Sequence, residues 1–132
     1  MAITLEEADR IIDGARRKAA ELGTAVTVVV VDAGGHLVAL RRMDGAGFPT
    51  VEIARDKALT AAGFGADTAQ LAQIMGQMPA FASGIQISQG WLRFAGGGVP
   101  IRRDGQLLGA IGISGSSAEN DVLCAQAGVA QL

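Results

Sequence analysis

The chain has 132 residues, of which 49% are hydrophobic and 18% are charged, and its formal net charge is −2. This length is enough for one domain with a real core, so we expect a single domain over residues 1–132. The weak, scattered charge argues against nucleic acid as a partner, and no apolar run is long enough to predict a membrane span. A lone cysteine and no recognisable leader favour the cytoplasm.

The first elements predicted from the sequence are a helix and a hairpin. Thr4 and Glu7 form a capping box before residues 5–22, where apolar side chains recur at helical spacing. The continuous valine run in residues 24–32 predicts a strand that is buried on both faces. Residues 36–42 then return as the second strand of the hairpin.

The middle of the chain is predicted to be mostly helical. Pro49 begins a helix that includes residues 51–63, and a further helix covers residues 68–78. Pro79 is expected to end that helix, since proline removes a backbone donor. Residues 80–90 give only weak signals, typical of a short strand or a loop.

The C-terminal part is predicted to be a second hairpin followed by a helix. Asp104 and Gly105 form a strong two-residue turn signal. Ser116 and Glu119 are placed as a capping box for a helix over residues 118–130. Two such hairpins predict a mostly antiparallel sheet of about five strands in an α+β fold, with helices mainly on one face.

Two glycines in the last predicted strand, Gly109 and Gly112, are unusual. Glycine weakens a strand and marks a place where a ligand or another backbone comes close. We interpret both as leaving room beside a ligand pocket.

Four side chains are candidates for chemistry. His36 is the only histidine, so it is either a surface residue or the histidine that Ser-His-Asp catalysis would have to use. Lys57 has weakly charged helical neighbours, so its ammonium either extends past an apolar surface or points into a pocket. Arg42 and Asp44 follow a strand end, where they either line a site or form an ion pair with each other.

Backbone amides supply the remaining candidates. Gly96, Gly97 and Gly98 permit a ligand to approach the main chain closely. Ser114 and Ser116 lie at a predicted helix N-terminus, which can bind a carboxylate or another anion. No cluster of cysteine and histidine predicts a metal site.

Several segments together resemble the GlcG/HbpS family, also called the haem-degrading domain family, which is related to the C-terminal domain of PduO-type corrinoid adenosyltransferases. They are VVDAGGHLVALRRMDGA at 30–46, ARDKALTAAGF at 54–64, GGGVPIRRDGQLLGAIGISGS at 96–116 and ENDVLCAQAG at 119–128. The resemblance implies one α+β domain with a profilin- or PAS-like layout. It also implies homo-oligomers, from dimers up to octamers.

Three functions remain open at this point. The first is binding of a small-molecule ligand, haem or a related tetrapyrrole, with His36 as the axial ligand and Arg or Lys side chains on the propionates. The second is a cofactor-free isomerase, tautomerase or hydrolase, in which Arg42 holds a carboxylate while Lys57 or Asp44 moves protons. The third is an oligomeric accessory protein without catalysis. We favour the first.

Overall fold

The computed structural model describes residues 2–132. Within them, five helices and four strands follow one another along the chain. They are α1 (Leu5–Glu21), β1 (Thr27–Asp32), β2 (Leu37–Arg42), α2 (Pro49–Phe64), α3 (Thr68–Gly76), α4 (Pro79–Ser88), β3 (Gly98–Arg103), β4 (Gln106–Ser114) and α5 (Ala118–Val129).

The strands form one antiparallel sheet in the order β2-β1-β4-β3. The two predicted hairpins are therefore present, and they are joined side by side through β1 and β4. The α+β fold class is confirmed, but the sheet has four strands rather than about five. The segment considered as a further strand, residues 80–90, is largely helix α4.

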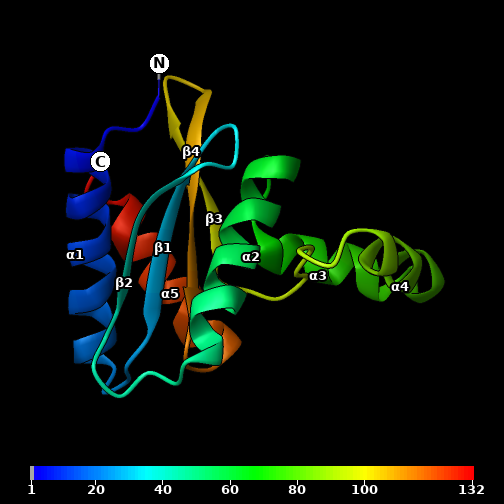
Figure 1. The fold of residues 1–132 in the computed structure, drawn as a ribbon, viewed down its shortest axis with the longest axis horizontal. Helices are drawn as coiled ribbons and strands as arrows, with labels where there is room; N and C mark the ends of the chain where they lie inside the picture. Colours follow the sequence, from blue (N-terminus) through cyan, green and yellow to red (C-terminus); the bar gives the residue numbers. More distant parts are fainter. Residues whose placement is uncertain (1) are drawn as a thin grey trace.

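Helices cover both faces of the sheet, so the expectation of helices mainly on one face was wrong. Helices α1 and α5 lie on one side, and α2 lies on the other (Figure 1). Alternate valines of β1 pack into the two hydrophobic layers on either side of the sheet. Val28 and Val30 face α1 and α5, whereas Val29 and Val31 face α2. This explains the continuous valine run, because a strand covered on both faces has no solvent side.

Helices α3 and α4 extend away from the sheet as an arm, which we define as residues 68–88 (Figure 1). Pro79 was expected only to stop a helix, but it also occupies the first turn of α4, where its missing N–H costs nothing. No residue of α4 is buried. The weak signals there reflect a helix that has no core-facing side within this chain.

The predicted turn and one of the two predicted helix caps are confirmed. Asp104 and Gly105 have φ values of 52° and 77°, as a type I′ hairpin turn requires. The Thr4 capping box is present. The cap of α5, however, is Ser117 rather than Ser116, with the Ser117 hydroxyl accepting from the Asn120 amide.

The two strand glycines leave room for backbone, not for a ligand pocket. A Cβ at Gly112 would lie 1.9 Å from the carbonyl oxygen of Ala54 in α2, and one at Gly109 would lie 2.1 Å from that of Val31 in β1. Helix α2 therefore packs directly on the main chain of β4. Our interpretation of these glycines was wrong, although a close approach does explain them.

Candidate functional site

The sheet register divides the predicted site residues between two ends of the molecule. Arg42 pairs with Thr27, which pairs in turn with Ser114 at the end of β4. His36 lies at the other end of β2, just before Leu37. Leu37 and Arg42 are five residue steps apart along the strand, or about 17 Å at 3.3 Å per step.

Lys57 forms a sealed ion pair with Asp121, a residue that sequence reasoning had not singled out. Its Nζ donates to Asp121 Oδ2 at 3.1 Å and to the Ile113 carbonyl at 2.8 Å. The side chains are only 6% and 3% exposed. Lys57 neither extends past an apolar surface nor opens into a pocket; it links α2 to the start of α5.

Several contacts surround the Asp121 carboxylate. Its other oxygen, Oδ1, accepts from the Ser116 amide at 3.1 Å. Burial raises the pKa of Asp121 above its ordinary value, although Lys57 and the Ser116 amide partly oppose that rise. The arrangement satisfies a buried charge and orients the helix start, as a structural clamp does.

The glycine triplet packs around this clamp. All three residues are buried, and a Cβ at Gly97 would lie 3.1 Å from Lys57 Nζ. The Gly98 amide donates to the Thr68 hydroxyl, and the Gly97 carbonyl accepts from the Ile113 amide. These backbone groups are therefore used within the chain.

The two predicted serines lie at the same end of the sheet as the clamp. Ser114 is 6% exposed. The Ser116 hydroxyl accepts a hydrogen bond from the Asn120 side chain, and the Ser116 amide donates one to Asp121. The structure thus brings together Lys57, the glycines and the serines, but around a carboxylate of this chain.

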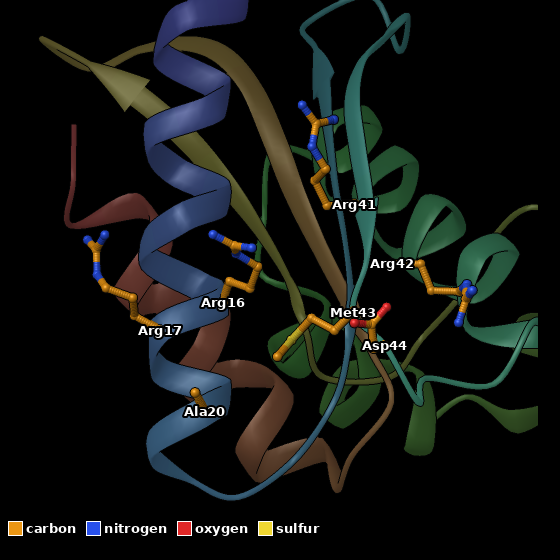
Figure 2. Close-up of a pocket in the computed structure, with 7 residues that line it drawn as sticks. All are labelled: Arg16, Arg17, Ala20, Arg41, Arg42, Met43 and Asp44. Atoms are coloured by element: carbon orange, nitrogen blue, oxygen red, sulfur yellow. The ribbon is translucent and has the colours of Figure 1, made fainter.

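Arg42 and Asp44 line a different feature, a surface groove of about 500 Å³ between α1 and the end of β2. Its lining is rich in arginine: Arg16, Arg17, Ala20, Arg41, Arg42, Met43 and Asp44. The guanidinium groups spread apart rather than converge (Figure 2). Arg42 turns away from α1 and donates to the Ala46 carbonyl at 2.8 Å.

Lys57 does not line this groove. The trio required by the cofactor-free enzyme, Arg42, Asp44 and Lys57, is therefore not gathered at one pocket.

His36 lies in the β1–β2 turn, and its side chain is 81% exposed. Its Nδ1 is 3.1 Å from Asp32 Oδ1, which also accepts from the amides of His36 and Gly34. Burial of Asp32 raises its pKa, but the hydrogen bonds and charge of His36 outweigh this and hold the pKa below its ordinary value. The carboxylate thus fixes one ring nitrogen and leaves Nε2 free to bind.

A second pocket, of about 380 Å³, lies directly beside this turn. Its lining is Ala33, Gly34, Gly35, Arg55, Leu59, Ala62, Gly63 and Trp91. Sequence reasoning missed Arg55, Leu59 and Trp91. The helical spacing of Arg55, Leu59 and Gly63 was an available signal for one face of α2, but nothing local places Trp91 against it.

This second pocket combines an apolar wall with few polar groups, as small-molecule sites do. Gly35 approaches Leu59, since a Cβ there would lie 3.2 Å from that side chain. Gly34 and Gly35 of the turn thus line the pocket together with residues of α2, and His36 follows them on the same turn. Within residues 2–132, no three His, Cys, Asp or Glu side chains gather as a metal cluster.

Comparison with known proteins agrees with this architecture. A family model described as "Haem degrading protein HbpS-like" matches residues 3–130. The chain belongs to the HbpS-like family. It is 33% identical to protein GlcG of Escherichia coli K12, covering 85% of this chain and 81% of GlcG. It is also 33% identical to the corrinoid adenosyltransferase PduO of Citrobacter freundii, but spans only 39% of that protein.

Solved structures in this family have the same fold. A double mutant of HbpS from Streptomyces reticuli superposes with a TM-score of 0.90 at 33% identity, over 100% of this chain and 88% of that one. The PduOC:heme complex superposes with a TM-score of 0.92 at 33% identity, over 100% and 96% of the two chains. No helix within residues 2–132 of our HbpS-like chain is both long and apolar enough to span a membrane.

Proposed function

We propose that this HbpS-like chain binds haem, or a related tetrapyrrole, in the pocket beside His36. The main support is the near-complete superposition on a chain whose structure is a haem complex, at a TM-score of 0.92. The family description points to haem as well. Haem binding by a relative does not identify the residues that would bind it here, so these must come from the geometry of this chain.

The donor chemistry of His36 fits an iron porphyrin. Neutral imidazole is a common axial ligand of haem iron. Asp32 occupies the Nδ1 side of the ring, which leaves Nε2 as the coordinating atom. The ring is exposed, so a ligand reaches it without opening the fold.

The neighbouring pocket fits the rest of such a ligand. Leu59, Ala62 and Trp91 offer an apolar wall against which a flat macrocycle packs. Arg55 lines the same pocket and supplies a guanidinium for a propionate. The cations expected from the sequence are less suitable: Lys57 is sealed, and Arg42 lies at the opposite end of the sheet.

Bound haem would supply a redox-active iron. The residues of the chain would hold the group in place. Asp32 would orient the imidazole of His36, which would bind the iron. Arg55 would neutralise a propionate, and the apolar wall would exclude water.

The proposal is tested by titrating hemin into the full chain and following the Soret band. We expect a sharpened, shifted Soret band in the wild type that His36→Ala weakens or shifts. Arg55→Gln should weaken binding by about tenfold, because a charge-assisted hydrogen bond contributes roughly 1.5–3 kcal/mol. Arg42→Gln is the matched control, an exposed arginine at the other end of the sheet, and should leave the affinity unchanged.

Two results would contradict the proposal. No Soret change in the wild type would exclude haem as the ligand. Equal affinity for wild type and Arg55→Gln, together with a loss in Arg42→Gln, would move the ligand to the arginine-lined groove.

A further inference from the structure

Basic side chains are concentrated in the arginine-lined groove between α1 and the end of β2 (Figure 2). The chain as a whole has a net charge of −2. The lining of this groove, in contrast, carries four guanidinium groups and one carboxylate, and so a net charge of +3. All of these charged residues are exposed. Positive charge gathered in a hollow of an acidic protein raises the local concentration of anions.

The guanidinium donors of the groove are only partly used within the chain. An arginine side chain has five N–H donors. Arg17 donates to the side-chain oxygen of Gln131 at 3.3 Å, and Arg42 donates to the Ala46 carbonyl at 2.8 Å. Both acceptors are neutral, so within residues 2–132 neither of these guanidiniums has a carboxylate partner. Donors and positive charge both remain for a ligand.

The other two arginines of the groove pair with aspartates that an anion can replace. Arg16 lies 3.1 Å from Asp13, and Arg41 lies 3.4 Å from Asp9. All four side chains are about half exposed, and ion pairs this exposed contribute little to stability. A ligand therefore competes with both aspartates at small cost.

The size of the groove suits a small molecule rather than a protein surface. Its volume of about 500 Å³ lies within the range of small-molecule sites, roughly 300–1,000 Å³. A protein interface engages roughly 20–30 residues on each side, whereas seven residues line this groove. Two of the seven, Ala20 and Met43, are apolar, so charge rather than apolar surface must select the ligand.

The placement of the charges points to an elongated anion. Arg16 and Arg17 lie on α1, whereas Arg41 and Arg42 lie on β2, and their guanidinium groups spread apart (Figure 2). A single small oxyanion cannot reach all of them. Linked phosphates, in contrast, carry negative charge on each successive group, and a guanidinium pairs with phosphate through two parallel hydrogen bonds.

We propose that the arginine-lined groove binds a small molecule that carries two or more linked phosphate groups, at a site separate from the haem pocket. Asp44 sets the direction in which this ligand lies. It is on the β2 side of the groove, beside Met43 (Figure 2), and its carboxylate repels phosphate. The phosphates therefore lie toward the arginines, and the uncharged end of the ligand faces Asp44.

The test is isothermal titration calorimetry of inorganic tripolyphosphate into the haem-free chain, at low salt and without divalent metal ions. We expect one saturable site per chain, whose affinity falls as salt is added, because salt screens exposed charges. Orthophosphate should bind at least about tenfold more weakly, since it loses at least one charge-assisted hydrogen bond.

Two arginines of α1 provide a matched pair of variants. Arg16→Gln should weaken tripolyphosphate binding about tenfold, the effect of losing one charge-assisted hydrogen bond. Arg10→Gln is the control, because Arg10 also pairs with a carboxylate and is 53% exposed against 54% for Arg16, but does not line the groove. Its affinity should stay within about twofold of the wild type. Asp44→Asn should tighten binding, which damage to the fold would not do.

Three results would overturn the proposal. The first is a wild type without saturable tripolyphosphate binding. The second is equal weakening by Arg16→Gln and Arg10→Gln, which would indicate diffuse attraction to basic side chains instead of a site. The third is tighter binding of citrate or of a glutamate-rich peptide than of tripolyphosphate, which would assign the groove to carboxylates.

A hemin titration separates this site from the proposed haem pocket. Hemin affinity should be the same for Arg16→Gln and the wild type, and tripolyphosphate should not displace hemin, because the groove and the pocket share no lining residue. Displacement would contradict the separation of the two sites. A wild type that binds tripolyphosphate but not hemin would support the groove and contradict only the haem proposal.

Discussion

The two ends of the sheet each carry a pair of opposite charges, and the pairs differ in access to solvent. Lys57 and Asp121 are 6% and 3% exposed. His36 and Asp32 are 81% and 27% exposed. At the first end, both Asp121 oxygens are used, and buried glycines surround the lysine. At the second end, Asp32 fixes the Nδ1 atom of His36, and the Nε2 atom is available to bind a ligand.

The difference shows that a polar cluster alone does not identify a binding site. Lys57, the glycine triplet and the serines had the residue types expected of a ligand site. The fold instead completes their hydrogen bonds with Asp121 and with backbone groups. Exposed, incompletely used donors beside a pocket are the better sign, and the His36 end offers such a donor beside a pocket with an apolar wall.

Breaking the sealed pair should give the largest effect on stability. Lys57→Met leaves Asp121 buried without its cation, which costs about 3–5 kcal/mol when one partner of a buried pair is removed. We expect this loss in the free energy of unfolding, measured by urea denaturation. Hemin affinity at 25 °C should be unchanged in whatever fraction stays folded.

The double variant Lys57→Met with Asp121→Leu is the control for that prediction. Replacing both charges by apolar groups should recover most of the stability, because no unpaired charge remains buried. If Lys57→Met alone were as stable as the wild type, the pair would not be the clamp that we describe.

Gly112 should be the next most sensitive position at the sealed end. In Gly112→Ala the new Cβ would meet backbone atoms of α2, Ala54 oxygen at 1.9 Å and Ala58 nitrogen at 2.6 Å. Helix α2 must then move, and such overpacking costs about 1–3 kcal/mol or more. Urea unfolding measures the loss.

Gly84→Ala provides the contrast from the arm. Nothing lies within 4 Å of its added Cβ, and Gly84 is inside α4. Alanine there should raise the stability of that helix by roughly 0.5–1 kcal/mol. Equal effects of the two alanines would show that the close contact between α2 and β4 is unimportant.

The fold was predictable where signals are local. The Asp104–Gly105 turn, the Thr4 cap and the valine strand depend on neighbours within a few residues or on continuous burial. Helix α4 was missed because its apolar residues have no core to face. The placement of helices on both faces depends on contacts between distant segments, which periodicity does not report.

The candidate site was less predictable for a related reason. Asp121 is 64 residues from Lys57 along the chain, so only the folded sheet brings them together. The pocket beside His36 likewise requires α2 and Trp91 to meet the β1–β2 turn. Sequence reasoning found His36 because it is the only histidine, but it did not find the pocket beside the turn that carries His36.

The smallest loss of stability is expected for Asp32→Asn, which changes the exposed His36–Asp32 pair. Because His36 and Gly34 hold the pKa of Asp32 below its ordinary value in the folded chain, the ionised carboxylate stabilises the fold at neutral pH. That contribution is present above the unfolded pKa, near pH 4, and is lost as pH falls through the lowered folded value. Asp32→Asn keeps an oxygen that accepts from both amides, so at pH 7 it should cost less than about 1 kcal/mol. The difference in urea midpoint from the wild type should vanish at the acid end of the range over which both proteins stay folded.

Hemin binding at pH 7 should suffer more from Asp32→Asn than stability does, because the ring of His36 loses the carboxylate that orients it. A stability loss as large as that of Lys57→Met would contradict the division of the molecule into a sealed end and an accessible one.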